Sequence, residues 1–122
     1  MQLRFLILCV SVLISPLAHG TTGSELLLHC QEVETSTASK PTRRPYSAGV
    51  CLGMVEGVSQ TMESANTSLP RELQTCFPQE RLTGIQATLI VLKYLRANPE
   101  ELHESASQLA FLAFHEAFPC SK

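Results

Sequence analysis

Two histidine–glutamate pairs come closest to a catalytic motif in this chain. His103-Glu104 and His115-Glu116 each begin like the helical zinc-protease motif, in which a second histidine follows four residues after the first. Position 107 is serine and position 119 is proline, so neither pair supplies that second zinc ligand. We therefore expect no metal site and interpret both pairs as solvated groups on a helix surface.

Cysteine offers a second route to chemistry, because a thiolate beside a histidine base can act as a nucleophile. Cys30 follows His29 directly, but adjacent side chains point in different directions on a helix. Four cysteines outside the N-terminal segment form an even set, which favours disulfides over free thiols. These are Cys30, Cys51, Cys76 and Cys120. The chain has no nucleophile elbow and no phosphate-binding glycine loop, so we expect no catalytic residue, no cofactor and no enzyme activity.

The first twenty residues have the pattern of a secretory signal peptide. Arg4 provides a short positive segment, and the apolar run 5–14 is too short to cross a bilayer as a helix. Residues 15–20 end in an Ala-x-Gly cleavage signal. We expect cleavage after Gly20, which leaves one domain over residues 21–122 in an oxidising compartment.

Composition argues against nucleic acid as a partner. The 122 residues include 9 Lys plus Arg and 11 Asp plus Glu, for a formal net charge of −2, and they contain no basic run. No second long apolar stretch follows the leader, so the cleaved chain is expected to be soluble and not to insert in a membrane.

Helical periodicity predicts a small all-α domain of four to five helices. Ser24 is the N-cap candidate of the first helix, which fades in the polar run 34–40. A second helix is expected from about Tyr46 to Ser64. It carries three glycines on one face, each costing roughly 1 kcal/mol relative to alanine, so we expect another helix to pack closely there. These are Gly49, Gly53 and Gly57.

A loop over 65–79 with a helical turn at 71–75 leads to the third helix, where Thr83 and Gln86 can form a capping box. Its expected buried face consists of Ile85, Leu89, Leu92 and Leu95. Asn98, with Pro99 after it, predicts that a fourth helix begins at once, antiparallel to the third.

The fourth helix carries two apolar stripes. One consists of Leu102, Ala106, Leu109, Ala113 and Ala117. The other consists of Phe111, Phe114 and Phe118. We interpret the phenylalanine stripe as core, with a partial dimer face as the alternative.

Helix order favours one pairing of the cysteines among the three possible. Cys30 and Cys51 lie on the two arms of the first helical hairpin. Cys76 precedes the third helix and Cys120 follows the fourth, and an antiparallel pair brings those ends together. The preferred disulfides are therefore Cys30–Cys51 and Cys76–Cys120.

These features, taken in order, resemble the Rap/Tai family of immunity proteins, which are associated with type VI secretion amidases. Val50 and Met54 stand where the family often has aromatic residues. The matching segments are the helix with Cys30, then 51–57, 76–78, 83–86, 93–95 with 99–100, and 117–120.

The resemblance implies a periplasmic, helical and often homodimeric protein that binds a cell-wall peptide amidase and blocks its cysteine active site. The residues shared with the family account for the fold, so contact with the effector is expected from the polar loops 34–46 and 64–75. The candidate contact residues are Arg43, Arg44, Tyr46, Asn66, Ser68 and Arg71.

Two other readings stay open. One is a small, acid-activated periplasmic chaperone, because protonation of the glutamates and histidines would turn the net charge positive. Such chaperones are richer in lysine than this chain, and a client-aggregation assay at acid pH separates the two classes. The other is a protein with the family fold and no amidase partner.

Overall fold

Four α-helices make up most of the described chain, which covers residues 20–36 and 40–120 of this computed structural model. Within these ranges there is no strand, so the predicted all-α fold is confirmed. Residues 1–19 of the predicted signal peptide lie outside the described residues. The helices are α2 (Gly23–Thr35), α3 (Pro45–Ala65), α4 (Gly84–Ala97) and α5 (Ala106–Ala117), with short 3-10 turns at Asn66–Ser68 (η1), Arg71–Leu73 (η2) and Pro99–Glu101 (η3).

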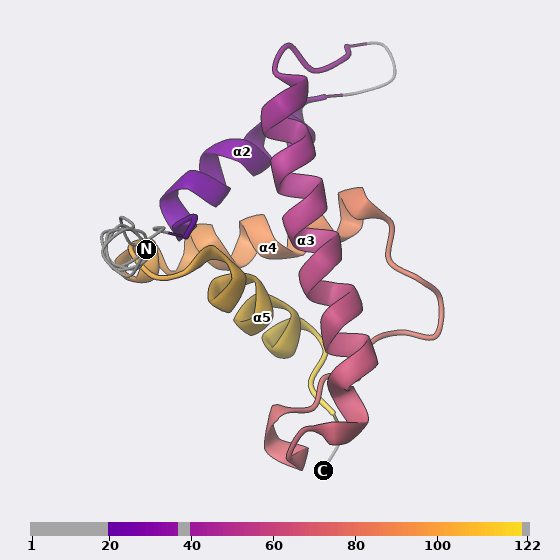
Figure 1. Ribbon diagram of the computed structural model, residues 1–122. Coiled ribbons are helices and arrows are strands. Elements are labelled where there is room, and N and C mark those ends of the chain that lie inside the picture. The colour runs from indigo at the N-terminus through magenta and orange to yellow at the C-terminus, as the bar shows by residue number, and fades with distance from the viewer. Residues whose placement is uncertain (1–19, 37–39, 121–122) are drawn as a thin grey trace, which may run out of the picture.

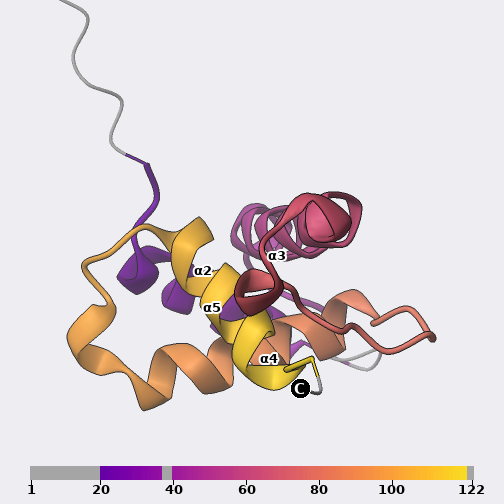
Figure 2. The ribbon, with the colours of Figure 1, turned by 90° about the horizontal axis from the view of Figure 1, so that it is seen from below.

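The longest helix, α3, runs the length of the molecule, and α2, α4 and α5 pack together on one of its sides (Figures 1 and 2). The core lies where these four helices meet. Phe114 of α5 is its largest fully buried side chain, as the core reading of the phenylalanine stripe predicts, while Phe111 and Phe118 are half-buried. The other fully enclosed large residues include Leu26, Val55, Val91, Leu92, Leu95 and Leu109.

Capping explains where α2 and α4 begin. At α4 the Gln86 amide N–H donates to Thr83 Oγ1, and the Gln86 side chain accepts from the Thr83 amide at 2.9 Å, as predicted. The predicted N-cap of α2 is wrong by two residues, because Thr22 forms the capping box there with Glu25. Ser24 instead lies in the first turn, where its hydroxyl donates to the Leu102 carbonyl.

The prediction that the fourth helix begins at Pro99 is wrong. Pro99–Glu101 form only a 3-10 turn, the Asn98 side chain donates back to the Tyr94 carbonyl, and α5 begins at Ala106. The reason is a long-range pairing: the Ala106 amide donates to the carbonyl of Thr21, not to the Leu102 carbonyl that a continuous helix would use. The chain before α2 therefore pulls this segment out of helical geometry.

The predicted buried face of α4 is wrong in its first half. Ile85 is 58% exposed and Leu89 is 45% exposed. The buried arc centres on Thr88, Val91 and Leu95, about a quarter-turn away from the first two residues. Leu92 lies between the two arcs and is buried as expected.

The predicted close packing at the glycines of α3 is also wrong. A Cβ atom added at Gly49, Gly53 or Gly57 would meet nothing within 4 Å. The tight glycines of the described chain lie elsewhere, and Gly23 is the tightest because an added Cβ would clash with Leu109 Cδ1. The glycine face of α3 is therefore open surface.

Both predicted disulfides are present. Cys30–Cys51 joins α2 to α3 inside the core, and Cys76–Cys120 joins the segment before α4 to the chain after α5. The first bond holds the N-terminal half of α3 to α2, and the second joins the segment between α3 and α4 to the end of the described chain after α5.

Candidate functional site

The predicted contact residues separate into two groups at opposite ends of α3. Arg43, Arg44 and Tyr46 surround its N-terminus, and Asn66, Ser68 and Arg71 follow its C-terminus. A helix of 21 residues is about 30 Å long, so no single small site contains both groups. We call residues 42–46 together with Glu32 the N-terminal corner, and residues 66–75 the η loop.

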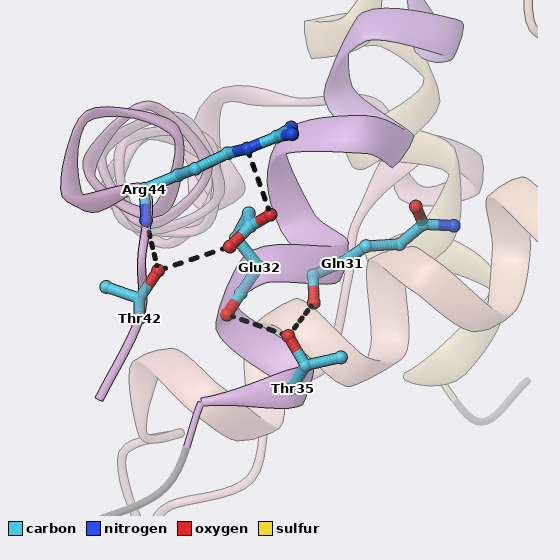
Figure 3. Close-up of polar contacts among 5 residues, drawn as sticks. All are labelled: Gln31, Glu32, Thr35, Thr42 and Arg44. Atoms are coloured by element: carbon cyan, nitrogen blue, oxygen red, sulfur yellow. Dashed lines mark hydrogen bonds and ion pairs between the residues drawn. The ribbon is translucent and has the colours of Figure 1, made fainter. Parts of the chain in front are cut away.

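A polar network anchors the N-terminal corner to α2 (Figure 3). Thr42 Oγ1 donates to Glu32 Oε2 at 3.3 Å and accepts from the Arg44 amide at 3.1 Å. Arg44 Nε lies 3.7 Å from Glu32 Oε1. The Glu32 carboxylate, which is largely covered, thus holds the chain that enters α3. Thr35 closes the end of α2 beside it, donating to the carbonyls of Gln31 and Glu32.

Exposed side chains project from this anchored backbone. Tyr46 is 79% exposed, and its ring lies nearly perpendicular to the His29 ring at a centroid distance of 6.5 Å. The Arg44 side chain is 74% exposed in spite of its ion pair, and Arg43 is exposed beside it. Tyrosine and arginine are the residue types enriched at the energetic centres of protein interfaces. A polar cleft of about 400 Å³ lies between the segment 40–44 and the C-terminal end of α2.

Sequence reasoning missed the residues of α2 that complete the corner. His29 and Glu32 lie three positions apart on one helix face, and that face meets the start of α3. The available signal was the three-residue spacing of His29 and Glu32, which puts two polar side chains on the same face of the helix.

At the other end of α3, the η loop uses one predicted contact residue for its own fold. Asn66 Oδ1 accepts from the Thr75 amide at 2.9 Å, and Thr75 is 1% exposed. Ser68 and Arg71 are exposed. This end therefore presents fewer free side chains than the sequence alone suggests.

An apolar groove between α3 and α5 lies between the two ends, and sequence reasoning did not predict it. Its volume is about 440 Å³. The lining residues are Gly53, Met54, Gly57, Val58, Thr61, Met62, Ser107 and Phe111. The spacing of the glycines in α3 could have indicated this surface. In the structure Gly53 and Gly57 line an open groove and do not pack against another helix.

The described residues contain no cluster of potential metal ligands, because among them no group of three or more His, Cys, Asp or Glu side chains could hold a metal ion. His103 pairs with Glu104 at 3.2 Å in solvent, as predicted, but both residues lie in the turn before α5 and not on a helix surface. The same prediction is wrong for His115, which is half-buried, faces Thr75 Oγ1 at 3.3 Å and stacks on Phe111, because α5 turns this position toward the η loop.

Three ionisable groups in the described chain have pKa values displaced by their surroundings: Tyr94, Glu34 and Arg96, the last with its pKa raised by its hydrogen bond to Glu34. Burial, followed by the hydrogen bond to Glu101 at 2.9 Å, raises the pKa of Tyr94 to about 12. The two-point hydrogen bond from Arg96 lowers the pKa of Glu34 and ties α4 to α2. Both contacts join neighbouring parts of the helical frame, so we assign them to the fold.

The described helices include none that is long and apolar enough to cross a membrane. No curated protein and no solved structure matches the chain. A family model does match, the one described as Rap1a immunity proteins, and the match covers residues 22–120. That range contains all four described helices and both disulfides, and families of immunity proteins are typically non-catalytic. The chain therefore belongs to the family of Rap1a immunity proteins.

Proposed function

We propose that this protein is a periplasmic immunity protein that binds a peptidoglycan amidase delivered by a type VI secretion system and blocks its active site. The family match over residues 22–120 carries the proposal. The two disulfides support export, because such bonds persist in oxidising compartments, and residues 1–20 have the pattern of a leader.

Effector contact is assigned first to the N-terminal corner. Its backbone is held by Glu32 and Thr42, so the main chain that carries Arg43, Arg44 and Tyr46 has little freedom left to lose on binding. The exposed side chains of the η loop, Ser68 and Arg71, form a secondary contact in the same proposal. An interface of ordinary size buries about 800 Å² on each partner, enough to extend from the corner along α3.

Toxicity rescue tests the function directly. A candidate amidase from the same locus is directed to the periplasm of a bacterial host, alone or with this chain. We expect lysis with the amidase alone and growth with both, and purified protein is expected to inhibit release of peptide fragments from peptidoglycan. Lysis that continues despite equal expression of this chain would refute protection against that amidase.

The contact surface is tested by charge reversal. The double variant Arg43→Glu/Arg44→Glu is expected to weaken amidase inhibition about tenfold or more, because a buried charge contact typically costs 2 kcal/mol or more when reversed. Arg81→Glu makes the same kind of charge change at an exposed position outside both surfaces and is expected to bind normally. Equal inhibition by the wild type and the double variant would exclude the corner.

Homodimer formation belongs to the same proposal and rests on the family resemblance. Light scattering coupled to size exclusion is expected to give twice the mass of the cleaved chain. A monomeric mass at micromolar concentration would refute it without affecting the rescue experiment.

A further inference from the structure

The two disulfides of this protein occupy opposite environments. Cys30 and Cys51 are both 0% exposed and lie within the core cluster, where Thr88 Oγ1 contacts Cys51 Sγ at 3.7 Å. Cys76 is exposed, and Cys120 is half-buried. Thiol–disulfide exchange requires a thiolate to reach one of the two sulfurs of the bond. The exposed Cys76–Cys120 bond should therefore react faster than the buried Cys30–Cys51 bond.

The accessible disulfide fastens a defined unit. The Cys76 amide donates to the Phe118 carbonyl at 2.9 Å, and Thr75 pairs with Pro119 as an isolated bridge. Phe77 places its ring 5.7 Å from that of Phe114 and 5.6 Å from that of Phe118. These contacts dock the η loop on the end of α5.

Within residues 66–75 few groups are buried, so the docking of the η loop rests on the disulfide, on Phe77 and on the Cys76 backbone. Thr75 is the buried polar residue of the loop, and it is held by Asn66 and His115. Neither 3-10 turn of the loop contains a buried residue. Segments with few buried apolar contacts open at a lower free energy than a core, so loss of the covalent bond would act on this unit first.

We propose that the Cys76–Cys120 disulfide is a redox-sensitive clasp, which a dithiol reductant opens while the Cys30–Cys51 bond stays intact, and that opening it releases the η loop from α5. The core disulfide is shielded by α2, α3 and α4, so reduction there requires the helices to separate. The clasp requires only local exposure.

The exchange step balances as an ordinary two-electron reduction. A thiolate of the reductant bonds to the Cys76 sulfur, and the S–S electron pair leaves with the Cys120 sulfur, which takes a proton from water. The second thiolate of the reductant then attacks the reductant's first sulfur, which is bonded to Cys76 in the mixed disulfide. This releases the Cys76 thiolate, which takes a proton from water. The protein gains two thiols, and the reductant becomes a disulfide.

Timed reduction tests the order of opening. The full protein with both bonds formed is treated with dithiothreitol at neutral pH without denaturant, quenched with iodoacetamide and mapped by mass spectrometry. We expect alkylated Cys76 and Cys120 to appear about tenfold sooner or more than alkylated Cys30 and Cys51. Simultaneous appearance of four modified cysteines, or earlier modification of the core pair, would overturn the proposal.

Hydrogen exchange tests the structural consequence. In the singly reduced protein the amides of Thr75 and Cys76 are expected to lose protection about tenfold or more, while those of α2 and α4 keep theirs. The variant Cys76→Ser/Cys120→Ser is expected to show the same pattern, and Cys30→Ser/Cys51→Ser is the matched control that loses protection in α2. Unchanged protection at Thr75 and Cys76 after reduction would show that the bond is no clasp.

Discussion

At the scale of single residues, glycines that cannot be distinguished in the sequence differ in how much room surrounds their Cα atoms. Gly23 sits where α2 meets the chain before α5, and an added Cβ would lie 3.1 Å from the Leu102 carbonyl oxygen. Gly53 lies on the open face of α3. The same substitution should therefore have opposite effects at these two positions.

Gly23→Ala is expected to lower the free energy of unfolding by about 1–3 kcal/mol, because backbone and the buried Leu109 side chain must shift. Gly53→Ala is the matched control and should raise it by about 0.5–1 kcal/mol through helix propensity. Urea unfolding monitored by circular dichroism measures both. Equal midpoints for Gly23→Ala and the wild type would contradict the crowding at this position.

Tyr94 gives a second prediction at this scale. Its pKa of about 12 means that the folded state keeps the phenol proton more tightly than the unfolded chain. The stabilisation is complete below the ordinary tyrosine pKa near 10 and is lost as the pH rises toward 12.

Glu101→Gln removes the negative charge beside Tyr94 and should lower this pKa, although not fully to the ordinary value, because burial is the larger cause. Ultraviolet titration of tyrosinate in a Tyr46→Phe background isolates the signal. A titration midpoint that does not move in Glu101→Gln would show that the hydrogen bond has no influence on the phenol.

At the scale of elements, some helix boundaries are set by local capping residues and others by hydrogen bonds to distant parts of the chain. The Thr83 capping box was readable because both of its members lie within four residues. The start of α5 could not be predicted from local sequence, because Thr21 and Gly23 form backbone hydrogen bonds to residues more than 80 positions away along the chain. Pro99 after Asn98 is a strong local signal that this pairing overrides.

Thr83→Ala should therefore destabilise the protein by about 1 kcal/mol, through the loss of a cap for α4. Thr61→Ala is the matched control, because the exposed Thr61 hydroxyl only donates back to the Gly57 carbonyl, and its effect should stay within about 0.5 kcal/mol. Chemical denaturation compares the two. A loss as large for Thr61→Ala as for Thr83→Ala would argue against capping as the cause.

At the scale of the whole molecule, a core built from four short helices depends on its covalent links. A chain of this size buries only part of its apolar surface, and the Cys30–Cys51 bond constrains the unfolded state as well as filling the centre. The limited core leaves apolar side chains of α4 exposed, such as Ile85 and Leu89, and leaves Phe111 of α5 half-buried in the apolar groove.

Cys30→Ala/Cys51→Ala is expected to lower the free energy of unfolding by about 3 kcal/mol or more, from the loop of 21 residues that the bond closes. Thr88→Val keeps the bond and removes only its hydroxyl contact, so it should cost much less. Equilibrium unfolding in urea separates the two effects. A stability loss confined to Thr88→Val would refute the role of the disulfide.

The sequence by itself determined the helical periodicity, the Thr83 cap, the even cysteine set and the match to the family over residues 22–120. The helix order was also enough to pair the cysteines correctly. Tertiary structure decided which faces are buried, since Ile85 and Leu89 lie just beyond an arc set by three neighbouring helices. It also placed the candidate contact residues at two ends of α3 and left the glycines of that helix facing open space. Packing depends on surfaces that distant segments of the chain bring together. A local sequence pattern therefore specifies that a segment is helical but does not specify which residues that helix contacts.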